Sequence, residues 1–588
     1  MKKLLSFLIA ITLVLPFFAC GGKVTEDAPL TQPDDFNGTK VVYVPLDNRP
    51  VNYTRAKYLA QSAGLELVMP NEEWLSSTLG ESFDQGDPAK IFNWLKQQEG
   101  DYYLLSLDML FSGGLVGSRA AFDDKDDSIA NSESKFGEYT LSQTEKDIIN
   151  YLNELSKTKH LVVFDTVMRL ASTANYGGWD NAMYSYLREN FASVERKQLY
   201  DNELTVENIV SGYMYKADGT EIALGKVGGK DSAPYVTEYL RSRERKLVIA
   251  KELYSLCANN LSGLFIGVDD STADVNIQTN EIRYLQTILT AGNESTLLFS
   301  GADELGLTGI AQIAATVYGK LSFNLQYFGD GKDYVADSYD PGTLSDCVNS
   351  HIAAVGGTIS AENADIDLLV LTRSSESGTN ATAHKLNVSK LITKLKNNLK
   401  NNIPTCVIDA SAYEGYGALA QEMINAKLDL AQILGFSAWN TVGNSTGIAI
   451  SNAAARFTYL KNSKHITDLS HQGFYKAVAF AHIKDTAYKK FGNLPHTAQS
   501  NYTANYNKFT LFAGKIADLI NNGSIYVSAT EKQNLYDITA SNLFWPWNRN
   551  FEADFNLEIA ENGFGSAFAE KQTTYLRVNR QAVLPNRQ

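Results

Sequence analysis

The sequence predicts an α/β protein built from parallel strand–helix units, and two observations carry this prediction. Short runs rich in β-branched and aromatic residues alternate with longer helical stretches through most of the 588 residues. Nearly all of the strand candidates are continuous apolar runs, which is typical of parallel strands covered by helices on both faces. In chain order, the candidate strands are residues 40–46, 65–69, 102–107, 160–164, 263–268, 296–300, 366–371 and 405–408.

The stretches between these runs predict helices of the length that crossover connections need. They cover residues 54–62, 88–98, 141–157, 232–258, 276–291, 306–318, 387–400 and 419–433. The count fits a (β/α)8-like barrel, but two successive Rossmann-like domains would give the same list, and periodicity leaves both open.

Two larger parts are expected after the N-terminal segment. An α/β domain would cover residues 38–434. From about Gly435 the chain is mainly helical, and it ends with aromatic-rich segments around residues 544–555. We expect this helical and aromatic-rich part, residues 435–588, to complete the functional site.

The N-terminal segment predicts an exported protein that is anchored by lipid. A lysine pair precedes an apolar run at residues 4–18, which fits a secretory signal over residues 1–19 and is short for a membrane span. The run ends in Leu-Pro-Phe-Phe-Ala-Cys, which resembles a lipobox, so Cys20 would carry the lipid and residues 20–37 would form a flexible tether. We expect a cell-envelope protein, anchored to the membrane and facing the periplasm or the exterior. An ordinary secreted protein cut near Ala19 is the alternative.

The amino-acid composition indicates which classes of molecule the chain could bind. The formal net charge of −14 argues against binding to nucleic acid, because that function needs a basic surface. With 31 Tyr and 27 Phe, an acidic exported chain is suited to carbohydrate, since aromatic rings stack on sugars and carboxylates bond hydroxyls. The seven His residues form no metal-binding motif, so no zinc site is expected. No cofactor is expected, although Ca²⁺ or Mg²⁺ held by carboxylates is possible.

Acidic residues follow six of the predicted strands. Active sites of parallel α/β proteins form where the carboxyl ends of strands meet, so these acids are expected to lie near one another. A single Asp in such a place is usually a helix cap, but acidic residues after six different strands point to a function. The residues are Asp47, Asp108, Asp165, Asp269 with Asp270, Asp303 with Glu304, and Asp409.

The two acidic pairs are the strongest chemical signals, because adjacent carboxylates raise a carboxyl pKa and can supply both an acid and an ion. Asp269-Asp270 and Asp303-Glu304 each resemble, locally, the acidic pair that ends a barrel strand in two classes of hexosaminidase. We therefore expect Glu304 to be the general acid/base, with Asp303 or Asp269 as its carboxylate partner. The alternatives are helix caps or a cation site.

Other residues are suited to binding a substrate. Arginines and amides near strand ends could hold an anionic group or neutralise the acids, and two loops place Asn or Arg beside Trp. Trp in such loops can equally belong to the core. The candidate binding residues are Asp47, Asn48, Arg49, Asp108, Arg119, Arg169, Trp439, Asn440, Asn444, Trp547, Asn548 and Arg549.

Five of these segments occur in order and together look like the bacterial family catalogued as domain of unknown function 4127. They read Pro-Leu-Asp-Asn-Arg-Pro-Val-Asn, Gly-Gly-Leu-Val-Gly-Ser-Arg, Gly-Ala-Asp-Glu-Leu-Gly, Trp-Asn-Thr-Val-Gly-Asn and Pro-Trp-Asn-Arg-Asn-Phe-Glu. The resemblance spans about residues 40–555 and implies no particular activity.

Three functions follow as hypotheses. The first is a cell-envelope glycoside hydrolase that acts on a glycan or glycoconjugate through the strand-end carboxylates. The second is a hydrolase that uses a divalent cation, with Asp108, Asp269, Asp270 and Asp303 as ligands. The third is a surface lipoprotein that binds glycans without cleaving them.

Overall fold

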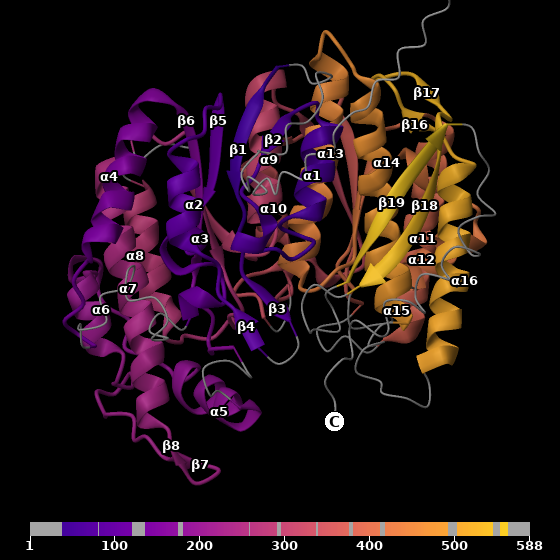
Figure 1. The fold of residues 1–588 in the computed structure, drawn as a ribbon. Helices are drawn as coiled ribbons and strands as arrows, with labels where there is room; N and C mark the ends of the chain where they lie inside the picture. Colours follow the sequence, from indigo (N-terminus) through magenta and orange to yellow (C-terminus); the bar gives the residue numbers. More distant parts are fainter. Residues whose placement is uncertain are drawn as a thin grey trace, which may run out of the picture.

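Two parallel sheets form the centre of the protein (Figure 1). The computed structural model describes residues 38–79, 82–119, 136–173, 180–257, 259–290, 296–336, 339–374, 380–411, 418–491, 502–544 and 553–561. The first sheet has the order β10-β9-β6-β5-β1-β2, and its strands are β1 (Lys40–Val44), β2 (Glu66–Val68), β5 (Tyr102–Ser106), β6 (His160–Val167), β9 (Gly263–Val268) and β10 (Thr296–Ser300). The second has the order β12-β11-β13-β14-β15, with β11 (Ser322–Phe328), β12 (Thr358–Ile359), β13 (Ile366–Leu371), β14 (Thr405–Asp409) and β15 (Ile433–Ser437).

The α/β class is therefore confirmed, and the parallel strands lie in two open sheets of the Rossmann-like kind. When the strands of each sheet are numbered by their order in the chain, both sheets have the strand order 2-1-3-4-5. The first sheet has a sixth strand after the fifth. In such doubly wound sheets the direction of winding reverses beside the first strand, and ligands bind in the crevice at the carboxyl ends there. The reversal falls between β1 and β5 in the first sheet and between β11 and β13 in the second.

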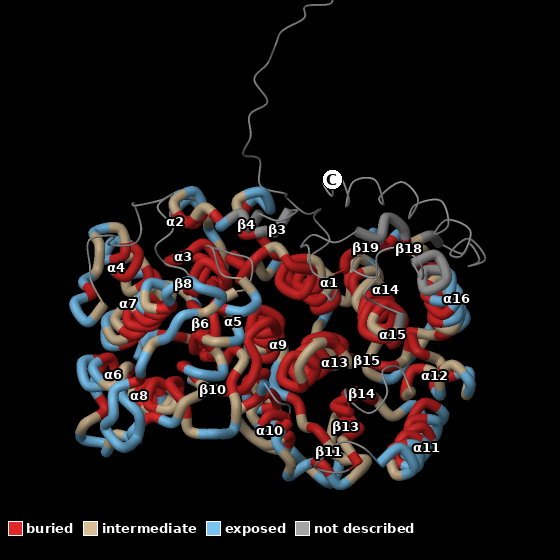
Figure 2. Tube along the Cα trace, turned by 90° about the horizontal axis from the view of Figure 1, so that it is seen from below, coloured by how far each residue is buried: buried red, intermediate tan, exposed pale blue. Residues whose placement is uncertain are grey.

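Helices between the two sheets join them into one core. α1 (Thr54–Ser62) and α9 (Leu305–Tyr318) pack against the first sheet, while α13 (Val442–Asn462) and α14 (Asp468–His482) pack against the second. α9 also packs on α13, and α1 on α14. Figure 2 shows α9 and α13 buried side by side in the middle of the molecule. The site described below lies at the start of these two helices.

Glycines bring α9 very close to the first sheet. A Cβ atom at Gly306 would lie 2.1 Å from the Tyr43 hydroxyl, and one at Gly309 would lie 2.4 Å from Leu104. The helix therefore rests directly on β1 and β5, which fixes the position of the residues just before it.

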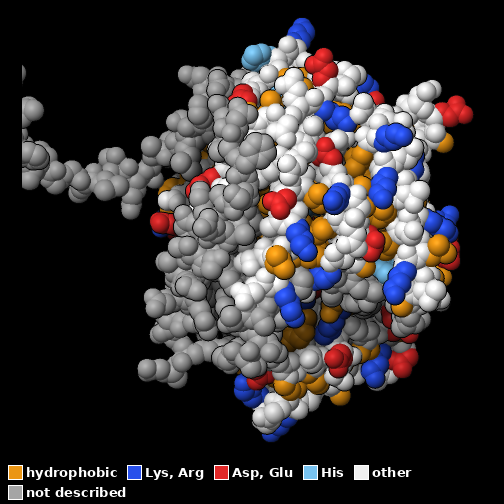
Figure 3. All heavy atoms as spheres, turned by 90° about the vertical axis from the view of Figure 1, so that its right-hand side faces the viewer, with side chains coloured by type: hydrophobic (Ala, Val, Ile, Leu, Met, Phe, Trp, Pro, Cys, Tyr) orange, Lys and Arg blue, Asp and Glu red, His pale blue; other side chains and the backbone are white. Residues whose placement is uncertain are grey.

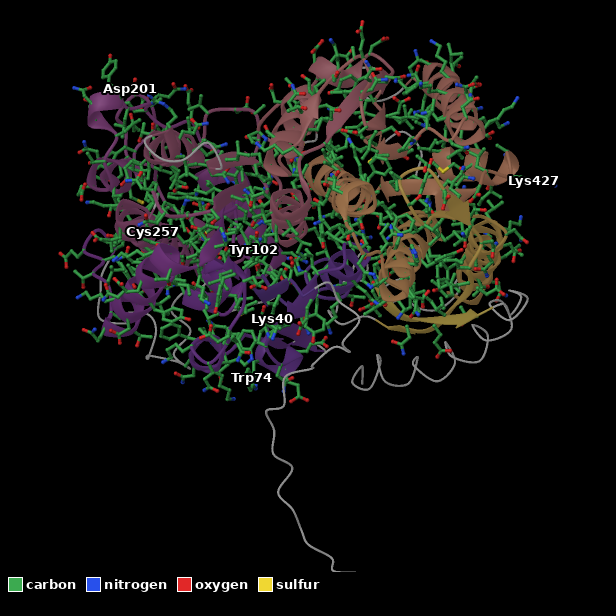
Figure 4. The ribbon with its side chains drawn as sticks, turned by 90° about the horizontal axis from the view of Figure 1, so that it is seen from above. Lys40, Trp74, Tyr102, Asp201, Cys257 and Lys427 are labelled. Atoms are coloured by element: carbon green, nitrogen blue, oxygen red, sulfur yellow. The ribbon has the colours of Figure 1, made fainter. Side chains whose placement is uncertain are left out.

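The remaining helices cover the outer faces and the C-terminal part, except for the helix at residues 344–354, which packs against α9, α13 and β10. They are α2 (Pro88–Leu95), α3 (Leu107–Ser112), α4 (Gln143–Thr158), α5 (Asn181–Tyr186), α6 (Val206–Gly212), α7 (Ala233–Cys257), α8 (Gln278–Thr290), α10 (Leu344–Ala354), α11 (Ala381–Lys400), α12 (Ala418–Asn425), α15 (Lys489–Phe491) and α16 (Tyr502–Asn521). Outside the two parallel sheets, the other described strands form four antiparallel pairs: β3 (Ser77–Leu79) with β4 (Ser82–Asp84), β7 (Lys226–Val227) with β8 (Lys230–Asp231), β16 (Ile525–Tyr526) with β17 (Lys532–Gln533), and β18 (Tyr536–Phe544) with β19 (Asp554–Glu561). Viewed from above, Lys40 and Tyr102, which begin the adjacent strands β1 and β5, lie far from Lys427 in the other half (Figure 4).

The sequence prediction missed three of the five strands of the second sheet: β11, the two-residue β12, and β15. β11 alternates polar and apolar residues and is only partly buried, so it lacks the continuous apolar run by which the other strands were recognised. The helix expected over residues 419–433 runs up to the first residue of β15, whereas α12 ends at Asn425 and a short 3-10 turn leads into the strand. The boundary expected at residues 434 and 435 falls inside β15.

The N-terminal segment expected to be a signal, Cys20 and the tether lie outside the described residues. Within the part of the chain that the structure describes, no helix is both long enough and apolar enough to cross a membrane.

Candidate functional site

Three carboxylates from distant parts of the first sheet share one arginine-rich cluster. Arg49, in the loop after β1, donates from Nη2 to Asp303 Oδ1 at 2.6 Å and from Nε to Asp47 Oδ2 at 2.9 Å. Asp303 follows β10, and Asp269, which follows β9, is close enough for its charge to act on Asp303. The carboxyl ends of β1, β9 and β10 therefore bring Asp47, Asp269 and Asp303 together, as parallel strands of one sheet require.

The loop after β1 is shaped by its own Asp. Asp47 Oδ1 accepts from the backbone N–H of Arg49 at 3.1 Å and from Asn52 Nδ2 at 2.8 Å, which closes a turn around the carboxylate. Asp47 is fully buried, while Asn48, at the tip of the turn, is half-buried. The turn holds the Arg49 side chain in position to reach across to β10.

Asp303 has the properties of a proton donor near neutral pH. Burial, reinforced by the nearby carboxylates of Asp47 and Asp269, raises its pKa to about 6, even though the charge and hydrogen bond of Arg49 oppose this shift. The side chain is 11% exposed, so it can meet a ligand from solvent.

Asp269 has the opposite tendency. Burial favours its neutral form, but Arg119 and Arg169 outweigh burial, and with smaller help from Arg49 they hold the pKa of Asp269 below its usual value. Arg119 forms an ion pair with Asp269 and also donates to Thr173 Oγ1 at 2.9 Å. The site therefore contains one carboxyl group poised to hold a proton beside another that stays ionised, a combination found in acid–base active sites.

Two backbone conformations at this site are unusual. Asp270, which forms an ion pair with Arg169, has a φ of 20°, and Asn440, in the loop after β15, has a φ of 58°. Only five non-glycine residues of the described chain have positive φ, and such residues tend to gather at binding and catalytic sites. Burial raises the pKa of Asp270, which Arg169 opposes and Asp269 reinforces.

Glu304 lies next to Asp303 in the chain but in a closed space. It precedes α9 without capping it. Instead, its Oε1 is 3.0 Å from His351 Nε2, its Oε2 accepts from Asn444 Nδ2 at 2.6 Å, and both Glu304 and His351 are fully buried. Gly301 and Gly447 make room for it, since Cβ atoms there would lie 1.9 and 2.2 Å from Glu304 atoms.

The hydrogen bonds of His351 limit the protonation states of this pair. His351 Nδ1 is 2.8 Å from the carbonyl oxygen of Cys347, which can only accept, so Nδ1 must carry a proton. The contact between Nε2 and Glu304 then holds one proton, either on the imidazole or on the carboxyl group. Glu304 is thus occupied on both oxygens by protein groups.

Two amides connect Glu304 to Asp303. Asn444, which donates to Glu304, accepts at Oδ1 from Asn440 Nδ2 at 2.7 Å, and the same Nδ2 lies 3.4 Å from Asp303 Oδ2. Asn444 is in the first turn of α13, which Thr441 caps. The loop after β15 of the second sheet therefore helps to orient an acid of the first sheet.

Other predicted residues lie in different surroundings. Asp108 forms an ion pair with Lys246 and accepts from Thr166 Oγ1 at 2.8 Å, and this buried group includes Asp165 but none of the arginines above. Trp439 is only 2% exposed, and Lys484 lies 4.1 Å from the centre of its ring, so it is packed in the interior. The predicted binding residues Trp547, Asn548 and Arg549 lie outside the described residues.

No group of three or more His, Cys, Asp or Glu residues is placed to hold a metal ion in the described part of the chain. The carboxylates of the cluster are bonded to arginine: Asp47 and Asp303 to Arg49, Asp269 to Arg119, and Asp270 to Arg169. A cation would have to compete with these guanidinium groups.

The sequence prediction missed His351 and the role it gives to Glu304. His351 is on α10, in a region where no element was predicted, and it has no acidic neighbour in the sequence that could have drawn attention to it. Ser172 and Arg188, which are discussed below, were missed because neither adjoins an acidic pair in the sequence.

Comparison with known proteins gives one match. The family model described as "Protein of unknown function (DUF4127)" matches residues 41–556. The searches of the curated proteins and of the solved structures found no match.

Proposed function

The chain belongs to the DUF4127 family, whose description names no activity, and we propose from the site itself that the protein hydrolyses glycosidic bonds. In this proposal Asp303 is the general acid and Asp269 is the ionised carboxylate that stabilises positive charge on the sugar or attacks it. One observation carries the proposal: two neighbouring strand-end carboxyl groups have pKa values shifted in opposite directions.

The acid role expected for Glu304 is assigned to Asp303 for a geometric reason. A general acid must reach the leaving oxygen of the substrate. Glu304 is fully buried and bonded on both oxygens, whereas Asp303 is partly exposed and has a pKa near 6. Glu304 then serves as a positioning residue that acts on Asp303 through Asn444 and Asn440.

A carbohydrate or glycoconjugate of the cell envelope is the proposed substrate, and the lipid on Cys20 would hold the enzyme near it. Nucleic acid is not proposed as a partner. On the face at the right-hand side of Figure 1, Lys and Arg side chains are spread among acidic and apolar ones (Figure 3).

The test is hydrolysis of glycosides by the purified protein. We expect cleavage of at least one glycoside or envelope glycan, and we expect Asp303→Asn to lower turnover of a substrate with a poor leaving group by about 10²- to 10⁴-fold, the usual contribution of a general acid. Product formation would be followed by chromatography of the released sugar.

Asp409→Asn is the matched control. Asp409 also follows a buried parallel strand, but its carboxylate bonds to the N–H and hydroxyl of Ser411 in a local turn. It should retain turnover. Full activity of Asp303→Asn would refute the assignment, and loss of activity with EDTA would favour the cation-dependent hydrolase. Glycan binding without any turnover would favour the non-catalytic binder.

A further inference from the structure

Several buried donors beside the two aspartates after β9 have no acceptor. In the described part of the chain, Arg119 Nε, Arg169 Nε, Arg188 Nη1 and Ser172 Oγ are buried and lack a hydrogen-bond partner. Leaving a buried donor unpaired destabilises a protein, so a concentration of such donors calls for an explanation.

The three arginines meet at the loop that contains Asp269, Asp270 and Ser271. Arg119 and Arg169 pair with the adjacent Asp269 and Asp270. Arg188 reaches the same loop, where its Nη2 lies 3.4 Å from the carbonyl oxygen of the next residue, Ser271.

Ser172 belongs to the segment that packs against this loop. It immediately precedes Thr173, whose hydroxyl accepts from Arg119 at 2.9 Å. A backbone bond of 3.2 Å from Leu170 N–H to Asp270 carbonyl oxygen holds this segment against the loop.

The charge of this group favours an anion. Arg119, Arg169 and Arg188 act on Asp269 and Asp270, so guanidinium groups outnumber carboxylates in this group, whereas the neighbouring Arg49 pairs with two carboxylates, Asp47 and Asp303. The side chains of Arg169 and Asp270 are 16% and 20% exposed, so a ligand can approach from that side.

The kind of atom left unpaired limits the chemical class of the ligand further. Arginine N–H groups can only donate, so their partner must accept. A sugar hydroxyl could also accept, but it carries no charge to match the guanidinium groups. Carboxylate, sulfate and phosphate oxygens accept only, and guanidinium binds them strongly.

We propose that Arg119, Arg169, Arg188 and Ser172 form an anion subsite, so that the substrate is an acidic glycan carrying a carboxylate or a sulfate or phosphate ester. This inference rests on the proposed function only in naming the substrate as a glycan; the anion subsite itself does not depend on it. The anion itself would be held beside Asp269, on the side of the site away from Asp47.

Binding can be measured without turnover. Titration calorimetry at constant ionic strength would use sodium sulfate, sodium phosphate and glucuronate as probes, with glucose as the neutral control. We expect at least one anion to bind and glucose to bind much more weakly. Sulfate or phosphate binding would indicate an ester, and glucuronate binding alone would indicate a carboxylate.

Two variants locate the subsite. Ser172→Ala should weaken anion binding by about three- to tenfold, as loss of one hydrogen bond does, yet leave the thermal midpoint unchanged or higher because it removes an unpaired hydroxyl. Arg188→Gln should weaken binding by at least about tenfold. Asn153→Ala, which removes an unpaired buried atom on α4, is the matched control and should bind anions like the parent.

The inference is overturned if no anion binds, or if Ser172→Ala and Arg188→Gln bind anions as tightly as Asn153→Ala. These results are separate from the test of catalysis. Hydrolysis of neutral glycosides without anion binding would contradict the subsite and leave the proposed function standing. Anion binding that depends on Arg188, without any hydrolysis, would support the subsite and contradict the proposed function.

Discussion

Glu304 occupies a closed space in which His351 and Asn444 already bond both of its carboxylate oxygens. Its neighbour Asp303 shares the strand end but is partly exposed and bonded to Arg49. Adjacent side chains at the end of a strand diverge, and here one enters the interior between α9 and α13 while the other faces the arginine cluster. The difference between the two acids is therefore one of direction and surroundings.

This difference gives a prediction for Glu304. Glu304→Gln should remain folded and keep most of its activity, because the amide can donate to His351 and accept from Asn444. Glu304→Ala should lower the free energy of unfolding by about 3 kcal/mol, since it leaves both partners buried and unpaired. Urea unfolding and turnover would be measured on both variants. A folded Glu304→Gln protein without turnover would return the acid role to Glu304.

For single residues, the sequence shows which acids follow the strands, but it does not show which side chains those acids pair with. Acids at the ends of β1, β9 and β10 could be predicted because parallel strands share an edge, and the structure brings Asp47, Asp269 and Asp303 together there. Asp108 follows β5 in the same way, yet it pairs with Lys246 of α7. The face on which a strand-end side chain emerges depends on packing, which one sequence does not reveal.

The elements that carry the site are the starts of α9 and α13. A Cβ atom at Gly443 would lie 3.0 Å from the carbonyl oxygen of Ser300, so α13 begins directly against the end of β10. This close approach lets the loop after β15 contribute Asn440 and Asn444 to an acid of the other sheet. The site thus depends on how the two helices pack.

Gly447→Ala tests that packing. The added methyl group would fall 2.2 Å from Glu304 Cγ and 2.9 Å from His351, so we expect the free energy of unfolding to drop by about 1–3 kcal/mol, as in other overpacked cores. Calorimetric unfolding would measure it. Gly514→Ala on α16 is the control: nothing lies within 4 Å of its Cβ position, and it should stabilise by up to about 1 kcal/mol. Equal effects of the two changes would contradict the packing described.

Elements with continuous apolar runs were predictable, and those without were not. β9 and β13 are buried along their whole length and were placed at the right residues. β11 was overlooked because its partly exposed residues alternate in polarity, and α10, which carries His351, was overlooked with it. The missing region is also where the second sheet begins, so the sequence could not separate a barrel from two sheets.

For the whole molecule, two sheets of the same strand order share one core, and the site uses residues from both halves. Both sheets have a winding reversal, but the arginine-rich cluster is at the carboxyl ends of the first. The second sheet contributes the loop that completes it.

Location is also a property of the whole chain, and it gives a separate prediction. Cys20→Ala should move the protein from the membrane fraction to the soluble fraction, because the expected lipid on this residue would be its anchor. Cell fractionation with detection of the protein would test this. Retention of the variant in the membrane after removal of its signal would contradict lipid anchoring through Cys20.

The pH dependence of kcat/KM on an unactivated glycoside tests the central claim most directly. A general acid with a pKa of about 6 is protonated below that pH, so kcat/KM should fall as pH rises through about 6. This falling limb should persist in Glu304→Gln and be absent from the small residual activity of Asp303→Asn. An unchanged profile in Asp303→Asn, with turnover equal to that of the parent, would contradict the account.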